Sequence, residues 1–123
     1  MSSTAAWNEE REVLLGDRIR VADRWWPRLR GLIGRPEPEP GEGLLLRPCQ
    51  GVHMQWMRYP LDVAFVADDG RIVALYHELR PWRFSKTHRD AACALELPAG
   101  TLRATGTEVG DRISWRSSSQ AAA

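Results

Sequence analysis

From Gly43 onward, the chain alternates short apolar segments with turn residues, and this pattern constrains its fold more than any other feature. Short segments rich in β-branched and aromatic residues, bounded by glycine, proline or aspartate, are typical of strands. Asp68-Asp69-Gly70 predicts a tight hairpin, because glycine tolerates positive φ. The segments expected as strands are 44–46, 52–57, 63–67, 72–79, 93–97 and 112–115.

The N-terminal part predicts a hairpin followed by a single helix. Segments 12–15 and 18–22 flank Gly16-Asp17, as the two strands of a hairpin would. Asp23 can cap a helix over 24–33, whose apolar residues fall on one face. We therefore predict a mainly β fold, a small barrel or sandwich of seven to eight short strands with one short α-helix.

The length of 123 residues predicts one domain. We expect residues 9–116 to form it and residues 1–8 and 117–123 to fray, because both ends are small and polar. Neither a secretory signal nor an apolar run of about 20 residues is visible, so we expect a cytoplasmic protein without membrane contact. Cys49 and Cys93 are then expected to be reduced, buried thiols.

The balance of charges argues against partners that are found through long-range attraction. The formal net charge is +1, so there is no global field that would steer nucleic acid or lipid to the protein. The sequence also lacks a Gly-rich dinucleotide motif, a P-loop, a zinc-protease helix and a serine nucleophile motif. These absences leave the function open between a binding module and a small enzyme.

Short motifs recur in order along the chain: Arg30-Gly31-Leu32 with Arg35, Gly43-Leu44-Leu45, Cys49-x-x-x-His53, Met57 with Pro60-Leu61-Asp62, Val63-x-Phe65, Asp69-Gly70, Glu96-Leu97-Pro98-Ala99-Gly100 and Gly110-Asp111. This series resembles the family known as domain of unknown function 192, which we expect to be bacterial. The resemblance spans roughly residues 18–115 and implies a small, mainly β fold with no established activity, substrate or cofactor. Members often carry Trp-Met-x-Asn-Thr where this chain has Trp56-Met57-Arg58-Tyr59.

A soft-metal site could use Cys49, His53 and Met57, which offer a thiol, an imidazole and a thioether. In a strand, however, neighbours in this set would lie about 13 Å apart, too far to share one ion. Only a sharp bend at Gly51 could bring the first two together. We expect neither a metal nor a cofactor, and we expect His53 and Met57 to be packed or binding residues.

An acid–base group could use His53, Asp62 and Glu96, since a carboxylate beside an imidazole sets its tautomer and pKa. The alternative is structural, because acids beside proline and glycine often accept backbone N–H groups at turns. Strand alternation predicts that Asp62 points away from Val63 and Phe65. If His53 lies on that side, Asp62 should raise its pKa.

The segment 18–35 combines arginines with two adjacent tryptophans, a pairing found in protein interfaces and in nucleic-acid sites. Trp25, Trp26, Arg28 and Arg35 are its candidate binding residues. A solvated arginine face is the first expectation here, a protein partner the second, and nucleic acid the third. The leading functional hypothesis is a non-catalytic binding or accessory module that holds a protein or small ligand near the loops with His53, Asp62 and Glu96. The alternative is a small enzyme that uses the same three side chains.

Overall fold

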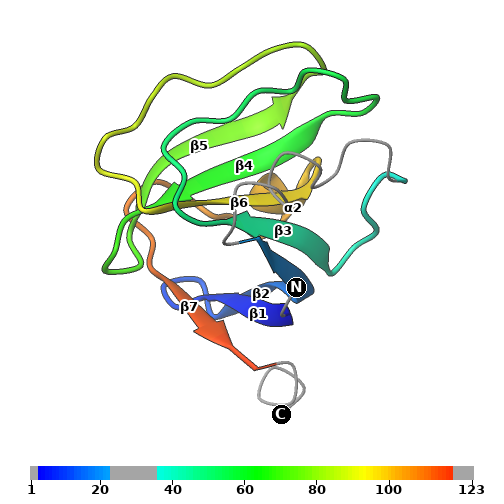
Figure 1. The fold of residues 1–123 in the computed structure, drawn as a ribbon. Coiled ribbons are helices and arrows are strands. Elements are labelled where there is room, and N and C mark those ends of the chain that lie inside the picture. Colours follow the sequence, from blue (N-terminus) through cyan, green and yellow to red (C-terminus); the bar gives the residue numbers. More distant parts are fainter. Residues whose placement is uncertain (1–2, 23–35, 118–123) are drawn as a thin grey trace.

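The structure is a computed structural model that describes residues 3–22 and 36–117. Within these ranges, seven strands form one sheet in the order β5-β4-β6-β3-β2-β1-β7 (Figure 1). Neighbouring strands are antiparallel except β2 and β3, which are parallel. The elements are β1 (Ser3–Asn8), β2 (Val13–Ala22), β3 (Glu42–Leu46), β4 (Leu61–Val66), β5 (Ile72–Leu79), β6 (Cys93–Pro98), α2 (Thr101–Ala104) and β7 (Ile113–Arg116).

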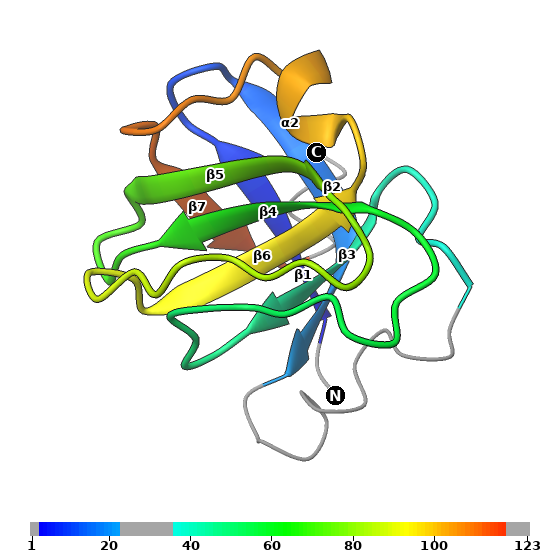
Figure 2. The same cartoon turned by 90° about the horizontal axis from the view of Figure 1, so that it is seen from above.

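The sheet curls until its two edges meet at one corner, which makes it a half-barrel (Figure 2). Arg71 and Arg112 form an isolated antiparallel bridge. Next to it, the amide of Ile113 donates to the carbonyl of Gly70 at 2.7 Å. Gly70 is required there, because it has φ +89° and an added Cβ would lie 2.6 Å from the carbonyl oxygen of Ile113. The hairpin predicted at Asp68-Asp69-Gly70 and the predicted mainly β fold are confirmed.

The interior of the half-barrel is apolar and is closed at one end by α2. Inward-facing side chains of all seven strands pack there, including Ile19, Leu45 and Leu95. Leu102 of α2 inserts into this cluster and is fully buried. The single turn of α2 therefore covers one end of the barrel interior.

A second core lies on the outer face of β3, β4 and β6. Leu44, Val63 and Phe65 are fully buried strand residues of this core. Two long connections, residues 47–60 and 80–92, cover this face and lie alongside each other in both views (Figures 1 and 2). We call these two segments the paired loops.

The N-terminal prediction is wrong in two respects. Residues 3–8 form β1 instead of fraying, and residues 13–22 form one continuous strand instead of a hairpin. Gly16 lies inside β2, where the backbone of Gly41 approaches it closely. An added Cβ would lie 2.7 Å from the Ile19 side chain and 3.0 Å from the Gly41 carbonyl oxygen. The turn lies earlier, between β1 and β2. There the side-chain oxygen of Asn8 accepts hydrogen bonds from the backbone amides of Glu10 and Arg11, each at 3.1 Å.

Two further predicted elements differ from the structure or lie outside its described residues. Residues 52–57 do not form a strand, since only His53 makes a β-bridge, to Phe84. Trp56 has φ +67°, which extended backbone does not allow. The helix predicted over 24–33 lies outside the described residues. The helix that the structure does show, α2, was not predicted, because one turn of four residues carries no helical period.

Candidate functional site

Asp62 is a structural clamp at the barrel end. It lies opposite a bulge in β5, where Leu61 pairs with Leu79 but Val63 pairs with Tyr76. Its side chain is fully buried. One carboxylate oxygen accepts the amide of Glu78 at 2.8 Å, and the other accepts the amide of Leu102 at 2.8 Å. Asp62 therefore fastens α2 to the bulge, which is the structural alternative that the sequence left open.

Asp62 and Glu96 point to opposite faces of the sheet. In the pairing of β4 with β6, Asp62 lies opposite Leu97, and Val63 lies opposite Glu96. Directly paired residues share a face and successive residues alternate. Asp62 therefore faces the barrel interior, whereas Glu96 faces the second core on the outer face of the sheet, which we call the outer core.

Glu96 is a buried carboxyl in apolar surroundings. Its residue is 8% exposed, and its direct neighbours across the sheet are Leu44 and Val63. Burial raises the pKa of Glu96 from its usual 4.5 to about 7. Burial alone raises this pKa, and no hydrogen bond from another described residue opposes it.

His53 is exposed on the first of the paired loops. Among the described residues, no hydrogen bond joins His53 to Asp62 or Glu96. The three residues of the predicted acid–base group are therefore not brought together as one group. Met57 is buried with Met54 and Leu61, so it is a core residue. Trp25, Trp26, Arg28 and Arg35 lie outside the described residues.

The two cysteines are buried thiols. Cys49 packs in the outer core, and its sulfur lies 3.1 Å from the carbonyl oxygen of Gly51. Burial raises the pKa of Cys93 to about 11, which keeps that thiol protonated and unreactive. In the described part of the chain, no group of three or more histidine, cysteine or acidic residues has a geometry that could hold a metal ion.

The paired loops form a ribbon that is held along its length. Backbone hydrogen bonds join them antiparallel from one end to the other. Tyr76 of β5 fixes the ribbon to the sheet, because its hydroxyl lies 2.7 Å from His88 Nε2 and accepts the amide of Lys86 at 3.1 Å. The loop-to-loop bonds are Cys49 N to Ala92 O at 3.1 Å, His88 N to Gln50 O at 2.7 Å, Ser85 N to Val52 O at 2.9 Å, Met54 N to Arg83 O at 2.7 Å and Trp82 N to Met54 O at 2.8 Å.

Exposed aromatic side chains gather at one end of this ribbon. Trp56 is 65% exposed, Trp82 is 54% exposed and Phe84 is 75% exposed. The two tryptophan rings meet edge to face with centroids 4.9 Å apart. Both tryptophans also have positive φ, +67° and +68°. Bulky residues rarely adopt that conformation, and backbone strain of this kind concentrates at functional sites.

Exposed cations follow the whole ribbon. The paired loops hold six basic residues and one acid, Asp90, which gives a net charge of +5. Since the whole chain carries +1, the remaining residues carry −4. None of the six forms an ion pair with a described residue, whereas five other arginines do. The six are Arg47, Arg58, Arg80, Arg83, Lys86 and Arg89, all exposed.

Sequence reasoning missed this surface although the signal was present. The mixture of arginine and tryptophan was recognised in residues 18–35 but not in the paired loops, because these are separated by β4 and β5. Counting charge and aromatic residues together over 47–60 and 80–92 would have found it. The fold supplies the missing step by laying the two loops side by side.

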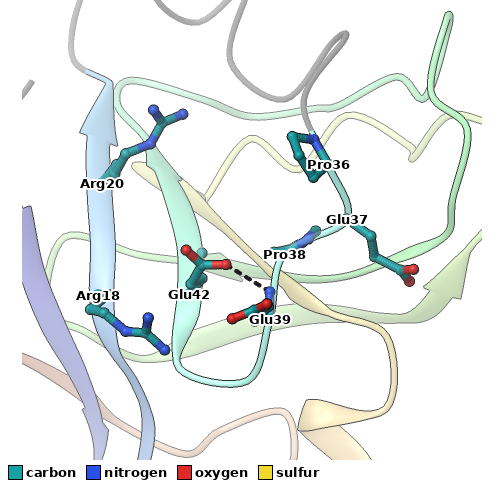
Figure 3. A pocket seen from close by; sticks show the side chains of 8 residues that line it. Arg18, Arg20, Pro36, Glu37, Pro38, Glu39 and Glu42 are labelled. Carbon is teal, nitrogen blue, oxygen red and sulfur yellow. Dashed lines mark hydrogen bonds between the residues drawn. The ribbon is translucent and has the colours of Figure 1, made fainter.

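Two hollows elsewhere are less suited to a charged ligand. A hollow of about 360 Å³ lies between β2, β3 and the proline-rich segment 36–40 (Figure 3). Two arginines on β2 extend toward it, but three glutamates also line it, so opposite charges meet there. A second hollow, of about 480 Å³ beside α2, is lined by apolar residues, glycines and threonines without an ionisable side chain.

The structural comparisons agree with the half-barrel. A Novosphingobium aromaticivorans protein of unknown function is 21% identical, with a TM-score of 0.79 over 92% of this chain and 84% of that one. A Sinorhizobium meliloti protein, provisionally described as a transcription regulator, is 26% identical, with a TM-score of 0.77 over 94% and 96%. In the described residues, no helix is long and apolar enough to cross a membrane.

Sequence relatives are found among the archaea. A UPF0127 protein of Pyrococcus furiosus is 35% identical over 103 residues, which cover 79% of this chain and 85% of that protein. A UPF0127 protein of Thermococcus sibiricus is 32% identical over 102 residues, and the matched region spans 66% of its length. The expectation of a purely bacterial family is therefore too narrow. Residues 6–115 match the family model DUF192, described as "Uncharacterized ACR, COG1430", and the chain belongs to that family.

Proposed function

We propose that this protein is a non-catalytic binding module that holds an anionic partner on its paired loops. The observation that carries the proposal is the coincidence of three exposed aromatic side chains with six exposed cations on one fixed ribbon. Tryptophan and arginine dominate the energetics of interfaces, because both bury a large area and both offer directed polar contacts.

The charge distribution supports an anionic partner in particular. Elsewhere on the described surface, Arg11, Arg18, Arg71, Arg103 and Arg116 each pair with an acid of this chain. The cations of the paired loops lack such partners among the described residues. A partner with negative groups would supply the missing counter-charges and would be attracted over about one Debye length, roughly 8 Å at physiological salt.

The placement of the predicted acid–base residues weakens the enzymatic alternative. Asp62 has both oxygens occupied by backbone amides and faces the barrel interior. Glu96 faces the other side of the sheet. An acid–base pair needs its members within hydrogen-bond reach of one reacting group. The provisional description of the Sinorhizobium meliloti protein as a transcription regulator also agrees with a binding role.

The proposal can be tested on immobilised heparin, a sulfated polysaccharide that serves as a general anionic probe. The wild-type protein should be retained at low ionic strength, and Arg83→Glu should elute at a clearly lower salt concentration. Arg112→Glu is the matched control, because it changes the charge equally at an exposed site beside β7. An unretained wild type, or an equal effect of both variants, would contradict the proposal.

A further inference from the structure

The linear form of the paired loops narrows the class of the partner. The loops run antiparallel from the Cys49–Ala92 contact to the Met54–Trp82 contact. From Arg83 to Arg89 the chain covers at most about 20 Å, at roughly 3.3 Å per residue. The binding surface is thus a strip and not a round patch.

Cations recur along this strip from one end to the other. Arg83, Lys86 and Arg89 follow at intervals of three residues on the second loop. Arg47 lies at the Cys49 end of the first loop, and Arg58 lies beyond the tryptophans at the other end. A partner that carries negative charge at regular intervals along a line would meet all of them. A compact anion would meet only one or two.

The aromatic end of the strip adds a second requirement. Trp82 and Phe84 are more than half exposed on the same loop as the evenly spaced cations, and Trp56 lies against Trp82. Flat exposed rings stack on other flat rings, and such stacking is tolerant of sequence because every nucleobase has a π-face. The partner should therefore carry planar rings as well as repeated charges.

We infer that the paired loops bind single-stranded nucleic acid, with phosphates along the cations and unpaired bases on Trp56, Trp82 and Phe84. This inference rests on the proposed binding function and names its partner class. The net charge of +1 does not oppose it, because the +5 of the paired loops is confined to one strip. An acidic protein segment would satisfy the cations but would leave the exposed rings without matching planar groups.

The experiment measures fluorescence anisotropy of a labelled oligothymidylate of about ten nucleotides, within the usual site size of such proteins. An abasic oligonucleotide of equal length keeps the phosphates but lacks the bases, and a polyglutamate peptide represents an acidic protein segment. Oligothymidylate should bind about tenfold more tightly than either. A duplex of the same length should bind more weakly than the single strand, because its bases are already stacked.

Variants separate the two kinds of contact. Phe84→Ala should weaken oligothymidylate binding by about tenfold and should change abasic binding little. Val109→Ala is the matched control, since Val109 is also 60% exposed but lies outside the loops. Arg83→Glu should weaken both oligonucleotides and lower the slope of log K against log salt by about 0.7.

The outcomes distinguish this inference from the function on which it rests. Equal binding of the abasic and the normal oligonucleotide would overturn the role of the rings, while an anionic partner would still stand. Tighter binding of polyglutamate or of the duplex would likewise overturn the single-strand assignment alone. If none of the anionic probes binds, the inference and the proposed function are both wrong.

Discussion

Replacing Glu96 by glutamine should change how the stability of the protein depends on pH. Glu96 is 8% exposed and makes no hydrogen bond to another described residue, and burial raises its pKa to about 7. The folded state therefore holds a proton on this carboxyl up to near-neutral pH. In the unfolded chain, where the usual value of 4.5 applies, the proton is lost much earlier.

The sign and size follow from linkage between proton binding and folding. Between pH 4.5 and pH 7, the folded state binds more protons than the unfolded state, so the free energy of unfolding falls as pH rises. A difference of about 2.5 pKa units, at about 1.4 kcal/mol per unit, corresponds to roughly 3–4 kcal/mol. This contribution is present in full below pH 4.5, is lost progressively as pH rises from there, and is gone above about pH 7. Glutamine does not ionise and removes it.

The assay is urea unfolding of wild type and Glu96→Gln at several pH values from 4 to 9. Relative to the wild type, the variant should gain about 3–4 kcal/mol of unfolding free energy from the acidic to the alkaline end. Glu37→Gln serves as control, because Glu37 is an exposed acid and its removal should leave the pH profile in place. A difference between wild type and Glu96→Gln that stays constant with pH would refute the reasoning.

Three further variants probe the barrel itself, each by the free energy of urea unfolding. Asp62→Asn should cost about 3 kcal/mol, because an amide group replaces one of the two oxygens that accept buried backbone N–H groups; a loss near zero would show that α2 does not depend on this clamp. Leu102→Ala should cost about 2–5 kcal/mol through the cavity left in the interior core, and an unchanged stability would place Leu102 outside that core. Asn8→Ala should cost about 3 kcal/mol, because the Asn8 amide donates to Thr107 and Asp111 at 3.0 Å while its oxygen accepts the amides of the following turn. A loss well under 1 kcal/mol would contradict that role for Asn8.

Local patterns predicted most of the sheet but not its start. Residues 72–79 were expected as a strand, and β5 has those bounds. Segments 44–46, 63–67, 93–97 and 112–115 lie within a residue or two of the observed strands. Gly16-Asp17 misled the prediction, because a glycine in a strand and a glycine in a turn look alike in sequence. Here a glycine is needed because the backbone of Gly41, which is distant in sequence, leaves little room for a side chain at Gly16.

The candidate sites show where local reasoning ends. Strand parity correctly directed Asp62 away from Val63 and Phe65, since those two lie in the outer core. Its partners could not be predicted, because they are the amides of a bulge 16 residues away and of a one-turn helix 40 residues away. Parity states a direction, whereas a partner depends on which distant segment the fold places there.

The net charge of the chain likewise gave no information on where the charges lie in the folded protein. A net value of +1 suggested that no anionic partner would be attracted, yet that value averages a strip of +5 with a remainder of −4. The strip exists only because the connections on either side of β4 and β5 return to the same face of the sheet, where Tyr76 holds one of them. An attraction screened within roughly 8 Å depends on the charges that lie nearby in space and not on the total. For a curled sheet with long connections, local charge on the folded surface is therefore the quantity that bears on the choice of partner.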